Sequence, residues 1–398
     1  MRILTFTSLF PNSIDPTHAI FVYQRSSHLA RRHGNEVLVV SPVPYFPRWL
    51  KTKRWRTAGQ LPEQEVVGGL TVHHPRYLLL PKISMPLHGL SMFLGSLRRV
   101  AELNRQANID CIDAHFVYPD GFAAVLLGKY LGVPVTVSAR GTDINLFPSF
   151  PLIRPMIRWT LRHADGVIAV SAALRDVMAD LGLPKDKIHL ISNAVDTARF
   201  RPIPAGEARQ RLSLPEGGPL LVSVGSLIEA KGHQLTIRAV ALIGKQFPSL
   251  RLYIIGEGPY RSELERLIKS LGLQERVQLL GKRPNEELPF WFGAASLSCL
   301  ASSREGWPNV VTESLACGTP VVATRVGGIP EILHSPELGT LVEQTSEDVA
   351  AGIVRSLGKE WDRQAISREA SARTWETVAE EVEEVLCNTI KQATSETR

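Results

Sequence analysis

A short segment with two glutamates offers the most specific chemistry in this sequence. Glu305 and Glu313 flank Gly306, Trp307 and Pro308, and a run of mainly apolar residues follows. Because glycine permits a tight turn and proline suits the first position of a helix, the segment predicts a loop that opens into a short helix. The backbone N–H groups at the start of such a helix have no intrahelical partner and attract phosphate oxygens.

The predicted helix start would bind a phosphate through its backbone, with donors from Trp307 to Val310, including Asn309. Glu313 lies one helical turn beyond Asn309 on the same face, so its carboxylate would face the sugar attached to that phosphate. A carboxylate can accept hydrogen bonds from the paired hydroxyls of a ribose. The alternative is an amphipathic helix with solvated glutamates, but that does not account for a Gly-Trp-Pro start beside two acids.

A second candidate phosphate contact follows an earlier predicted strand. The loop that begins with Gly225 and Ser226 ends in Lys231 at a helix start, where an ammonium could neutralise a diphosphate. A plain surface lysine is the alternative. Gly256 and Gly258 form another tight turn into a helix, a weak signal by itself. The sequence has neither a full G-x-G-x-x-G with a following acid nor a G-x-x-x-x-G-K-[ST], which disfavours dinucleotide oxidoreductases.

The first half of the chain contributes a histidine and a charged pair. His115 ends a predicted strand, so we expect its side chain to point into a ligand cleft, although an isolated histidine is more often structural. Arg140 and Asp143 follow the next strand and place a cation and a carboxylate at the same sheet edge. The convergence of these side chains favours a functional role for them.

Both halves of the chain alternate apolar strand patterns with helical patterns, which predicts parallel sheets covered by helices on both faces. The predicted strands are 2–7, 36–41, 110–115, 133–138, 166–170, 188–192, 219–225, 250–256, 277–281, 297–300, 320–324 and 339–342. The predicted helices of the first half are 21–33, 86–107, 119–131, 151–163 and 172–181.

A change of composition after residue 192, with prolines on both sides of a polar stretch, predicts a domain boundary. We expect an α/β protein with two doubly wound, Rossmann-like domains over 1–198 and 199–373. A final Glu-rich helical segment, 374–398, is expected to cross back to the first domain.

Composition sets the broad class of protein. Of 398 residues, 44% are hydrophobic and 21% charged, which is typical of a soluble protein, and no apolar run is long enough for a membrane span. The first residues lack a signal-peptide pattern, so we expect a cytoplasmic protein. The four cysteines form no C-x-x-C pair, which disfavours disulfides and zinc. A net charge of +6 suits an acidic partner, but no nucleic-acid signature accompanies it.

One long loop, Pro42 to Gly69, is predicted to lack regular structure. It carries basic residues interleaved with tryptophans, a pattern typical of contact with anionic lipid head groups, and a solvated basic loop is the equal alternative. An apolar and basic run from Leu78 to Arg99 would add to such a surface. The basic and aromatic residues of the loop are Trp49, Lys51, Lys53, Arg54, Trp55 and Arg56.

These motifs together resemble the retaining glycosyltransferases of family 4, which have the two-domain GT-B fold with a central cleft. The resemblance spans nearly the whole chain, and its most specific part is E-x7-E followed by A-C-G-x-P-V-V-A. The first-half pieces look most like bacterial enzymes of capsule, exopolysaccharide and teichuronic acid assembly. The supporting motifs are Val224-Gly225 with Lys231-Gly232, Ile255 to Pro259, Asn193 to Asp196 with Phe200 and Pro202, Ala114-His115-Phe116 with Pro119-Asp120-Gly121, and Arg140 to Asp143.

The resemblance implies an acceptor-binding N-terminal domain and a donor-binding C-terminal domain. Glu313 would bind the nucleotide ribose, Glu305 the donor sugar, Lys231 the diphosphate and His115 the sugar at the reaction centre. The resemblance also implies that the donor would be a nucleoside-diphosphate sugar, and neither a metal nor a cofactor is expected. The acceptor would be lipid-linked or a polysaccharide, at the inner face of the membrane.

The sequence departs from the family pattern at three places. Ser226 stands where many relatives have a second phosphate-binding arginine, and Ala194 replaces a usual glycine in the hinge. The loop before the first helix often carries glycines in the family, but here it contains Thr17, His18 and Ala19. We expect His18 to lie on the acceptor side. These departures leave open a non-catalytic sugar-nucleotide-binding or scaffold protein, as well as a GT-B epimerase or phosphorylase.

Overall fold

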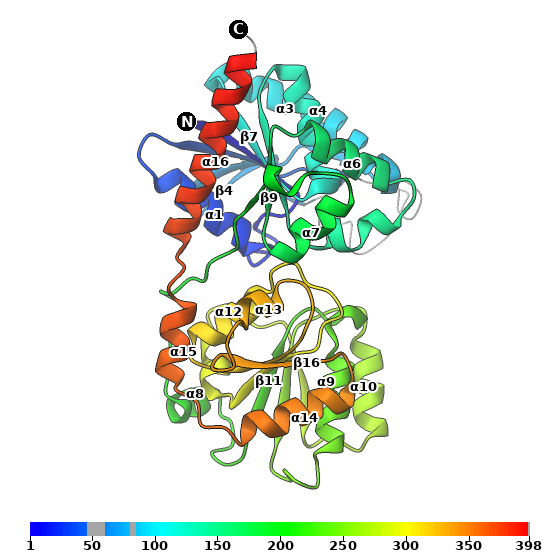
Figure 1. Ribbon diagram of the computed structural model, residues 1–398, viewed down its shortest axis with the longest axis vertical. Coiled ribbons are helices and arrows are strands. Elements are labelled where there is room, and N and C mark those ends of the chain that lie inside the picture. The colour runs from blue at the N-terminus through cyan, green and yellow to red at the C-terminus, as the bar shows by residue number, and fades with distance from the viewer. Residues whose placement is uncertain (46–59, 80–84, 397–398) are drawn as a thin grey trace. The chain divides into compact units, whose positions relative to one another are not determined.

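The computed structural model describes residues 1–45, 60–79 and 85–396. The chain divides into two compact units, of which unit 1 combines 1–193 with 375–398 and unit 2 spans 194–374. Each unit is a largely parallel β-sheet between layers of helices (Figure 1). The prediction of two doubly wound α/β domains is confirmed, and the chain passes between the units at 193/194, where the sequence suggested 198/199.

The described part of unit 1 contains an eight-stranded sheet in the order β10-β9-β8-β7-β1-β2-β5-β4 and a separate pair, β3-β6. All neighbours are parallel except β4 and β5. The order reverses between β1 and β7, which creates a switch point where ligands of doubly wound sheets bind. The strands are β1 Arg2–Phe6, β2 Glu36–Val40, β3 Val43–Tyr45, β4 Gln64–Val67, β5 Leu70–His73, β6 Arg76–Leu78, β7 Cys111–His115, β8 Val135–Ala139, β9 Gly166–Ala169 and β10 Ile188–Leu190.

The expectation of an unstructured segment from Pro42 to Gly69 is wrong for its described part. β3 lies near its beginning and β4 near its end, and β4 pairs with β5 in a hairpin. Gly68 and Gly69 both have positive φ, which a tight hairpin turn requires. The half-exposed, charged β4 is an edge strand and therefore lacks the apolar pattern of a buried one. The basic and tryptophan residues from Trp49 to Arg56 lie outside the described residues.

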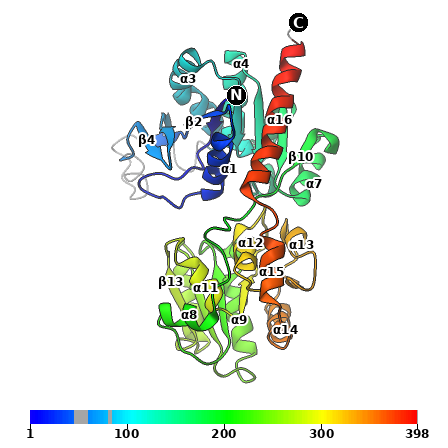
Figure 2. The same cartoon turned by 90° about the vertical axis from the view of Figure 1, so that its left-hand side faces the viewer.

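Helices cover both faces of the unit 1 sheet. Figures 1 and 2 show α16 running beside α1, while α3, α4 and α6 lie across the sheet. Val382 and Leu386 of α16 are fully buried, and the Arg32 side chain donates to Glu380 and Glu383. The C-terminal helix is thus an integral part of unit 1. The helices are α1 Ile20–Arg31, α3 His88–Ala107, α4 Phe122–Leu131, α5 Thr142–Asn145, α6 Arg154–His163, α7 Ala172–Asp180 and α16 Trp375–Glu396, with short turns η1 Met85–Leu87, η2 Val117–Gly121, η3 Phe147–Ser149 and η4 Lys185–Lys187.

Unit 2, which is described throughout, has a six-stranded parallel sheet in the order β13-β12-β11-β14-β15-β16. The order reverses between β11 and β14, which marks its switch point. Its strands are β11 Leu220–Val224, β12 Arg251–Ile255, β13 Val277–Gly281, β14 Leu297–Leu300, β15 Val321–Thr324 and β16 Gly339–Val342. Its helices are α8 Ala205–Arg211, η5 Glu229–Lys231, α9 His233–Leu242, α10 Arg261–Ser270, α11 Leu288–Ala294, α12 Asn309–Ala316, α13 Ile329–Ile332, α14 Ser346–Leu357 and α15 Arg363–Ala370.

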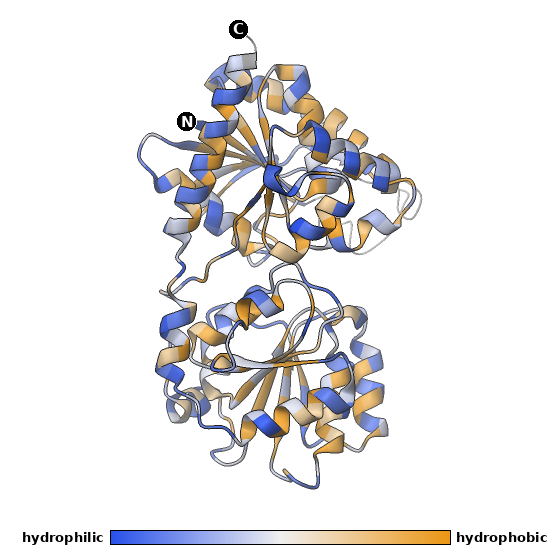
Figure 3. Cartoon of the chain, in the orientation of Figure 1, coloured by the Kyte–Doolittle hydropathy of each residue, from blue (hydrophilic) through white to orange (hydrophobic). Residues whose placement is uncertain are grey.

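Alternation along the unit 2 strands divides its core between the two faces. Leu252 and Ile254 pack with α9, α10 and α14, whereas Tyr253 and Ile255 pack with α8 and α11 on the opposite face. Because both faces are covered, the strands are almost continuously apolar, as the orange strands inside each unit show (Figure 3). None of the helices that the structure describes combines the length and hydropathy that a membrane span requires.

Candidate active site

The loops after β11 and β14 meet at the unit 2 switch point and join two of the predicted site residues. Lys231 Nζ lies 2.6 Å from Glu305 Oε1, and Ser302 Oγ donates to the same carboxylate oxygen at 2.7 Å. Glu305 is nearly buried at 8% exposure, while Lys231 retains 25%. An ammonium has more N–H donors than this pair uses, so Lys231 can also bind an anion.

The start of α12 lies next to Glu305 in the chain and leaves backbone donors available. The helix begins at Asn309, and Pro308 immediately precedes it rather than occupying its first position. The backbone N–H groups of Trp307 and Val310 form no hydrogen bond with any described residue, and Trp307 Nε1 is buried without a partner. This end of the helix can therefore donate several hydrogen bonds to a phosphate.

Glu313 is a half-buried carboxyl group on α12. Burial raises its pKa to about 7, an effect that Arg199 opposes and Asp196 reinforces. No described residue forms a hydrogen bond with its side chain. A desolvated carboxyl group without a partner gains most from a ligand that offers hydroxyl groups.

The glycines after β11 and β12 hold the two loops together. Gly256 has a φ of +153°, and a Cβ atom there would lie 1.9 Å from the Gly225 carbonyl oxygen. Gly258 is equally close to the backbone of Leu227, whereas Ser226 is exposed. The glycine pattern therefore allows close packing of the loops beneath Lys231 rather than direct contact of each glycine with a ligand.

His115 lies in a buried network of charged groups in unit 1. The Arg140 guanidinium donates to His115 Nδ1, and His115 Nε2 lies 3.3 Å from Asp113 Oδ2. Arg25 pairs with Asp113 at 2.8 Å. Burial lowers the pKa of His115 to about 3, although Asp113 opposes the shift, so the ring is neutral with its proton on Nε2. The His115 side chain is fully buried, and its assignment to the site stays a prediction.

Asp143 and Arg140 shape the ends of β7 and β8. The fully buried Asp143 carboxylate accepts backbone hydrogen bonds from Val117 at 2.8 Å, Gly141 at 2.8 Å and Arg140 at 3.2 Å. The half-buried Arg140 also donates to Asn193 Oδ1 at 3.1 Å. Burial lowers the Arg140 pKa to about 9, with Arg25 adding to the shift. Asp143 is thus placed to position the loop, and Arg140 to position His115.

The loop before α1 keeps a glycine-like conformation without glycine. Ala19 adopts φ 46° and ψ 45°, in the left-handed region. The neighbouring His18 is half-buried, and its backbone N–H donates to Asp15 at 3.2 Å. The alanine therefore reproduces a turn for which the family often uses glycine.

Sequence reasoning missed several buried polar groups of these sites. Asp120 accepts from the Ser8 backbone N–H, which links the loops after β1 and β7 at the unit 1 switch point, and burial raises its pKa to about 7. His233 lies beside Ser223 at 3.0 Å, and burial lowers its pKa to about 4. Asp120 belongs to the Pro-Asp-Gly motif and His233 directly follows the Lys-Gly motif, so these motifs could have identified both. No sequence signal identifies Arg25, because an arginine in a helical pattern is normally predicted to lie on the surface.

Comparison with known proteins agrees with this geometry. Residues 19–199 match the family described as "Glycosyltransferase Family 4", and residues 205–373 match "Glycosyl transferases group 1". A Mycobacterium tuberculosis GDP-mannose-dependent alpha-(1-6)-phosphatidylinositol monomannoside mannosyltransferase is 30% identical over 342 residues, which are 84% of each chain. The D-inositol 3-phosphate glycosyltransferase of Acidothermus cellulolyticus is 30% identical over 74% of this chain and 70% of its own.

The chain belongs to glycosyltransferase family 4. The resemblance inferred from the motifs is confirmed, and a catalytic glycosyltransferase that uses a nucleotide sugar is supported over a scaffold or an epimerase. The fold of this family 4 glycosyltransferase is GT-B. Anabaena HepE, solved in complex with UDP and glucose, superimposes with a TM-score of 0.74 at 21% identity and covers 98% of this chain and all of its own.

Proposed function

We propose that this family 4 glycosyltransferase moves a sugar from a nucleoside diphosphate to a lipid-linked or polysaccharide acceptor. We further propose retention of the anomeric configuration and independence of metals and cofactors. The convergence of Lys231, Glu305 and the open start of α12 in unit 2 carries this proposal. A relative named as a phosphatidylinositol monomannoside mannosyltransferase supports the acceptor class.

In the proposed reaction, unit 2 binds the donor and stabilises the leaving group. The Lys231 ammonium and the N–H groups at the start of α12 would neutralise the charge that develops on the leaving diphosphate. In other glycosyl transfers a metal ion can provide this stabilisation. Glu305 would bind donor sugar hydroxyls, and Glu313 the ribose. Ser226 adds no cation, so Lys231 and the helix start share this role.

Unit 1 would provide the acceptor side, with contributions from His18 and Arg140. His115 is neutral, so it can donate one hydrogen bond from Nε2 but brings no charge to the reaction centre. Asp143 would act only by positioning the loops around these residues.

The proposed chemistry can be tested with a panel of UDP-, GDP- and ADP-sugars and short acceptors in the presence of EDTA. We expect nucleoside diphosphate release and a product that retains the donor's anomeric configuration, measured by NMR. Lys231→Ala should lower turnover at least about 100-fold. Lys245→Ala, an exposed lysine of the same unit, is the matched control. Loss of turnover in EDTA, or an inverted product, would contradict the proposal.

We also propose that unit 1 lies on the cytoplasmic face of an anionic membrane. Leu87, Leu90 and Leu94 are each at least 45% exposed and are spaced along one face at the start of α3, with Arg98 one turn further. The triple variant Leu87→Ser, Leu90→Ser, Leu94→Ser should sediment less with phosphatidylglycerol vesicles. Leu242→Ser, an exposed leucine of unit 2, should not change binding. Equal sedimentation of both variants with wild type would reject this surface.

A further inference from the structure

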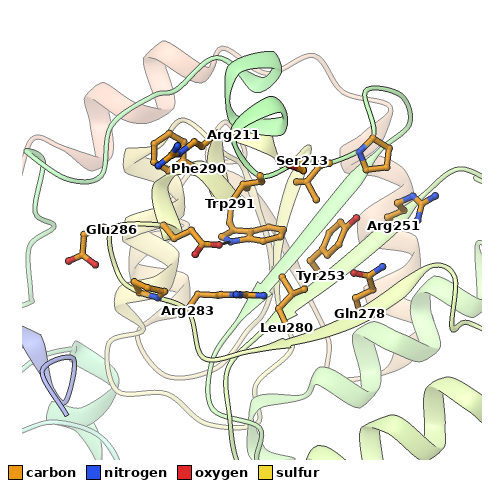
Figure 4. Close-up of a pocket in the computed structure, with 15 residues that line it drawn as sticks. Arg211, Ser213, Arg251, Tyr253, Gln278, Leu280, Arg283, Glu286, Phe290 and Trp291 are labelled. Carbon is orange, nitrogen blue, oxygen red and sulfur yellow. Dashed lines mark hydrogen bonds between the residues drawn. The ribbon is translucent and has the colours of Figure 1, made fainter. Parts of the chain in front are cut away.

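A cavity of about 750 Å³ lies in unit 2 and is lined by none of the residues assigned to the donor. Tyr253 of β12 and Leu280 of β13 form part of its floor, on the sheet face that α11 covers. The first turn of α11 and the segment 211–215, which starts at the last residue of α8, form its walls (Figure 4). Its volume is typical of small-molecule sites.

Three arginines line this cavity, and two of them have no partner. Arg251 Nη1 donates to the Glu275 carbonyl at 3.0 Å, but Arg211 and Arg283 form no hydrogen bond or ion pair with any residue that the structure describes. Arg283 Nε is buried without an acceptor, and in Figure 4 its side chain extends toward the middle of the cavity. A buried guanidinium donor without a partner is costly, and it indicates where an anion would bind.

The two acids of the cavity do not neutralise these arginines. Glu287 accepts from Trp291 Nε1 at 2.8 Å. Glu286 lies 3.7 Å from Arg199 Nη2, and its carboxylate points away from the cavity in Figure 4. The cavity therefore keeps an excess of positive charge, which favours a ligand with a carboxylate or a phosphate.

The remaining lining combines aromatic rings with neutral polar groups. The Tyr253 and Trp291 rings pack 5.2 Å apart at 48°, and Phe290 beside them is half-buried. Gln278 and Ser213 are exposed at the rim and offer an amide and a hydroxyl. Apolar surfaces with a few polar groups suit a ring that has both C–H faces and hydroxyls.

We propose that this cavity binds a sugar ring that carries a carboxylate or a phosphate, at a site separate from that of the donor. The arginines would hold the anionic group, Phe290 the ring, and Gln278 and Ser213 its hydroxyls. The site would hold an acidic unit of a glycan or a free sugar phosphate. This inference does not depend on which residues bind the donor or on the acceptor of the reaction.

The test uses the full chain and calorimetric titration with glucuronate, glucose 6-phosphate and glucose. We expect at least one anionic sugar to bind at least about 10-fold more tightly than glucose, because hydrogen bonds between charged groups are stronger than those between neutral ones. Stronger binding of glucuronate would indicate an acidic glycan unit, and stronger binding of glucose 6-phosphate a sugar phosphate. Equal affinity for glucose, or no binding of either anion at millimolar concentration, would overturn the proposal.

Variants locate the binding to the cavity. The double variant Arg211→Ala, Arg283→Ala should weaken the anionic sugar at least about 10-fold, while Arg238→Ala, an exposed arginine on α9, should not. Gln278→Ala, at an exposed edge-strand position, is a second variant that tests the site if the double variant does not fold. If Arg238→Ala weakens binding of the anionic sugar equally, or if UDP, GDP or ADP displaces the sugar, the proposal of a separate site is wrong.

Discussion

At the scale of single residues, the environment of Glu313 gives the clearest indication that a side chain binds a ligand. It is half-buried on α12, its carboxyl has no partner among the described residues, and burial raises its pKa to about 7. Burial without a hydrogen bond is unfavourable for a carboxylate, and ribose hydroxyls would relieve that cost.

We predict that Glu313→Ala abolishes discrimination between ribose and deoxyribose. Wild type should bind the best of UDP, GDP and ADP about 10-fold or more tightly than its 2′-deoxy analogue, because a hydrogen bond to a charged group contributes about 1.5–3 kcal/mol. The variant should bind both forms with similar affinity in calorimetry. Exposed Glu343→Ala is the control. Preserved discrimination in Glu313→Ala would remove the ribose assignment.

His115 leads to a prediction about acid stability. Its pKa is about 3 in the folded protein and about 6.5 when unfolded, so the unfolded chain takes up a proton first as pH falls. The stabilisation from the neutral ring is therefore complete above pH ~6.5 and is lost as pH falls toward 3. His115→Gln should show a smaller loss of unfolding free energy between pH 7 and pH 4 than wild type.

Urea unfolding at a series of pH values measures this difference. Asp113, whose pKa is about 2, loses its own contribution mainly below pH ~3.9. Other buried groups that titrate above pH 4 are common to both proteins, so the difference between wild type and His115→Gln in this window reports the histidine. The exposed His334→Gln serves as the control. A pH dependence of His115→Gln that matches wild type would mean that the histidine is not held neutral.

At the scale of elements, the turn between β15 and α13 packs against the backbone of Glu305, in the proposed donor site. Gly327 has a φ of +54°, and a Cβ atom there would lie 2.0 Å from the Glu305 carbonyl oxygen. Any side chain at this position must therefore displace the segment that presents Glu305 to Lys231.

We predict that Gly327→Ala lowers the free energy of unfolding by about 1–3 kcal/mol and turnover by more than that loss explains. Gly217→Ala is the matched control, because a Cβ atom there would meet nothing within 4 Å. Thermal unfolding and nucleoside diphosphate release measure the two effects. If Gly327→Ala retains wild-type turnover, the turn does not position Glu305.

The elements that sequence patterns located best were those with strong apolar signals. The strands Val277–Gly281, Leu297–Leu300 and Gly339–Val342 were predicted with their observed bounds. The β4–β5 hairpin was missed, because an edge strand with the sequence Gln-Glu-Val-Val has no continuous apolar run.

At the scale of the whole molecule, α16 begins directly after unit 2 yet completes the core of unit 1. Leu386 is fully buried there, so Leu386→Ala should lower the stability of unit 1 by about 2–5 kcal/mol. Because each unit has its own core, unit 2 should unfold as in wild type. Calorimetry should show one lowered transition. The control is Leu242→Ala, at an exposed position, which should shift neither of the two unfolding transitions. An unchanged calorimetric profile for Leu386→Ala would contradict this role for α16.

The sequence by itself determined the two doubly wound sheets, and it predicted that the segment from Glu305 to Glu313 binds a phosphate. Apolar periodicity and the glycine and proline signals are local, so they can be read without knowing which strands are neighbours. The family followed from the same short motifs.

Only the tertiary structure decided which of these residues are partners. Lys231 meets Glu305 because β11 and β14 are adjacent, and His115 is enclosed by Arg25, Asp113 and Arg140 from three different elements. The arginines of the unit 2 cavity that have no partner among the described residues likewise become visible only when β12, β13 and α11 pack together. Such pairings depend on strand order and on burial, and burial also sets the pKa of each group, which no local pattern encodes.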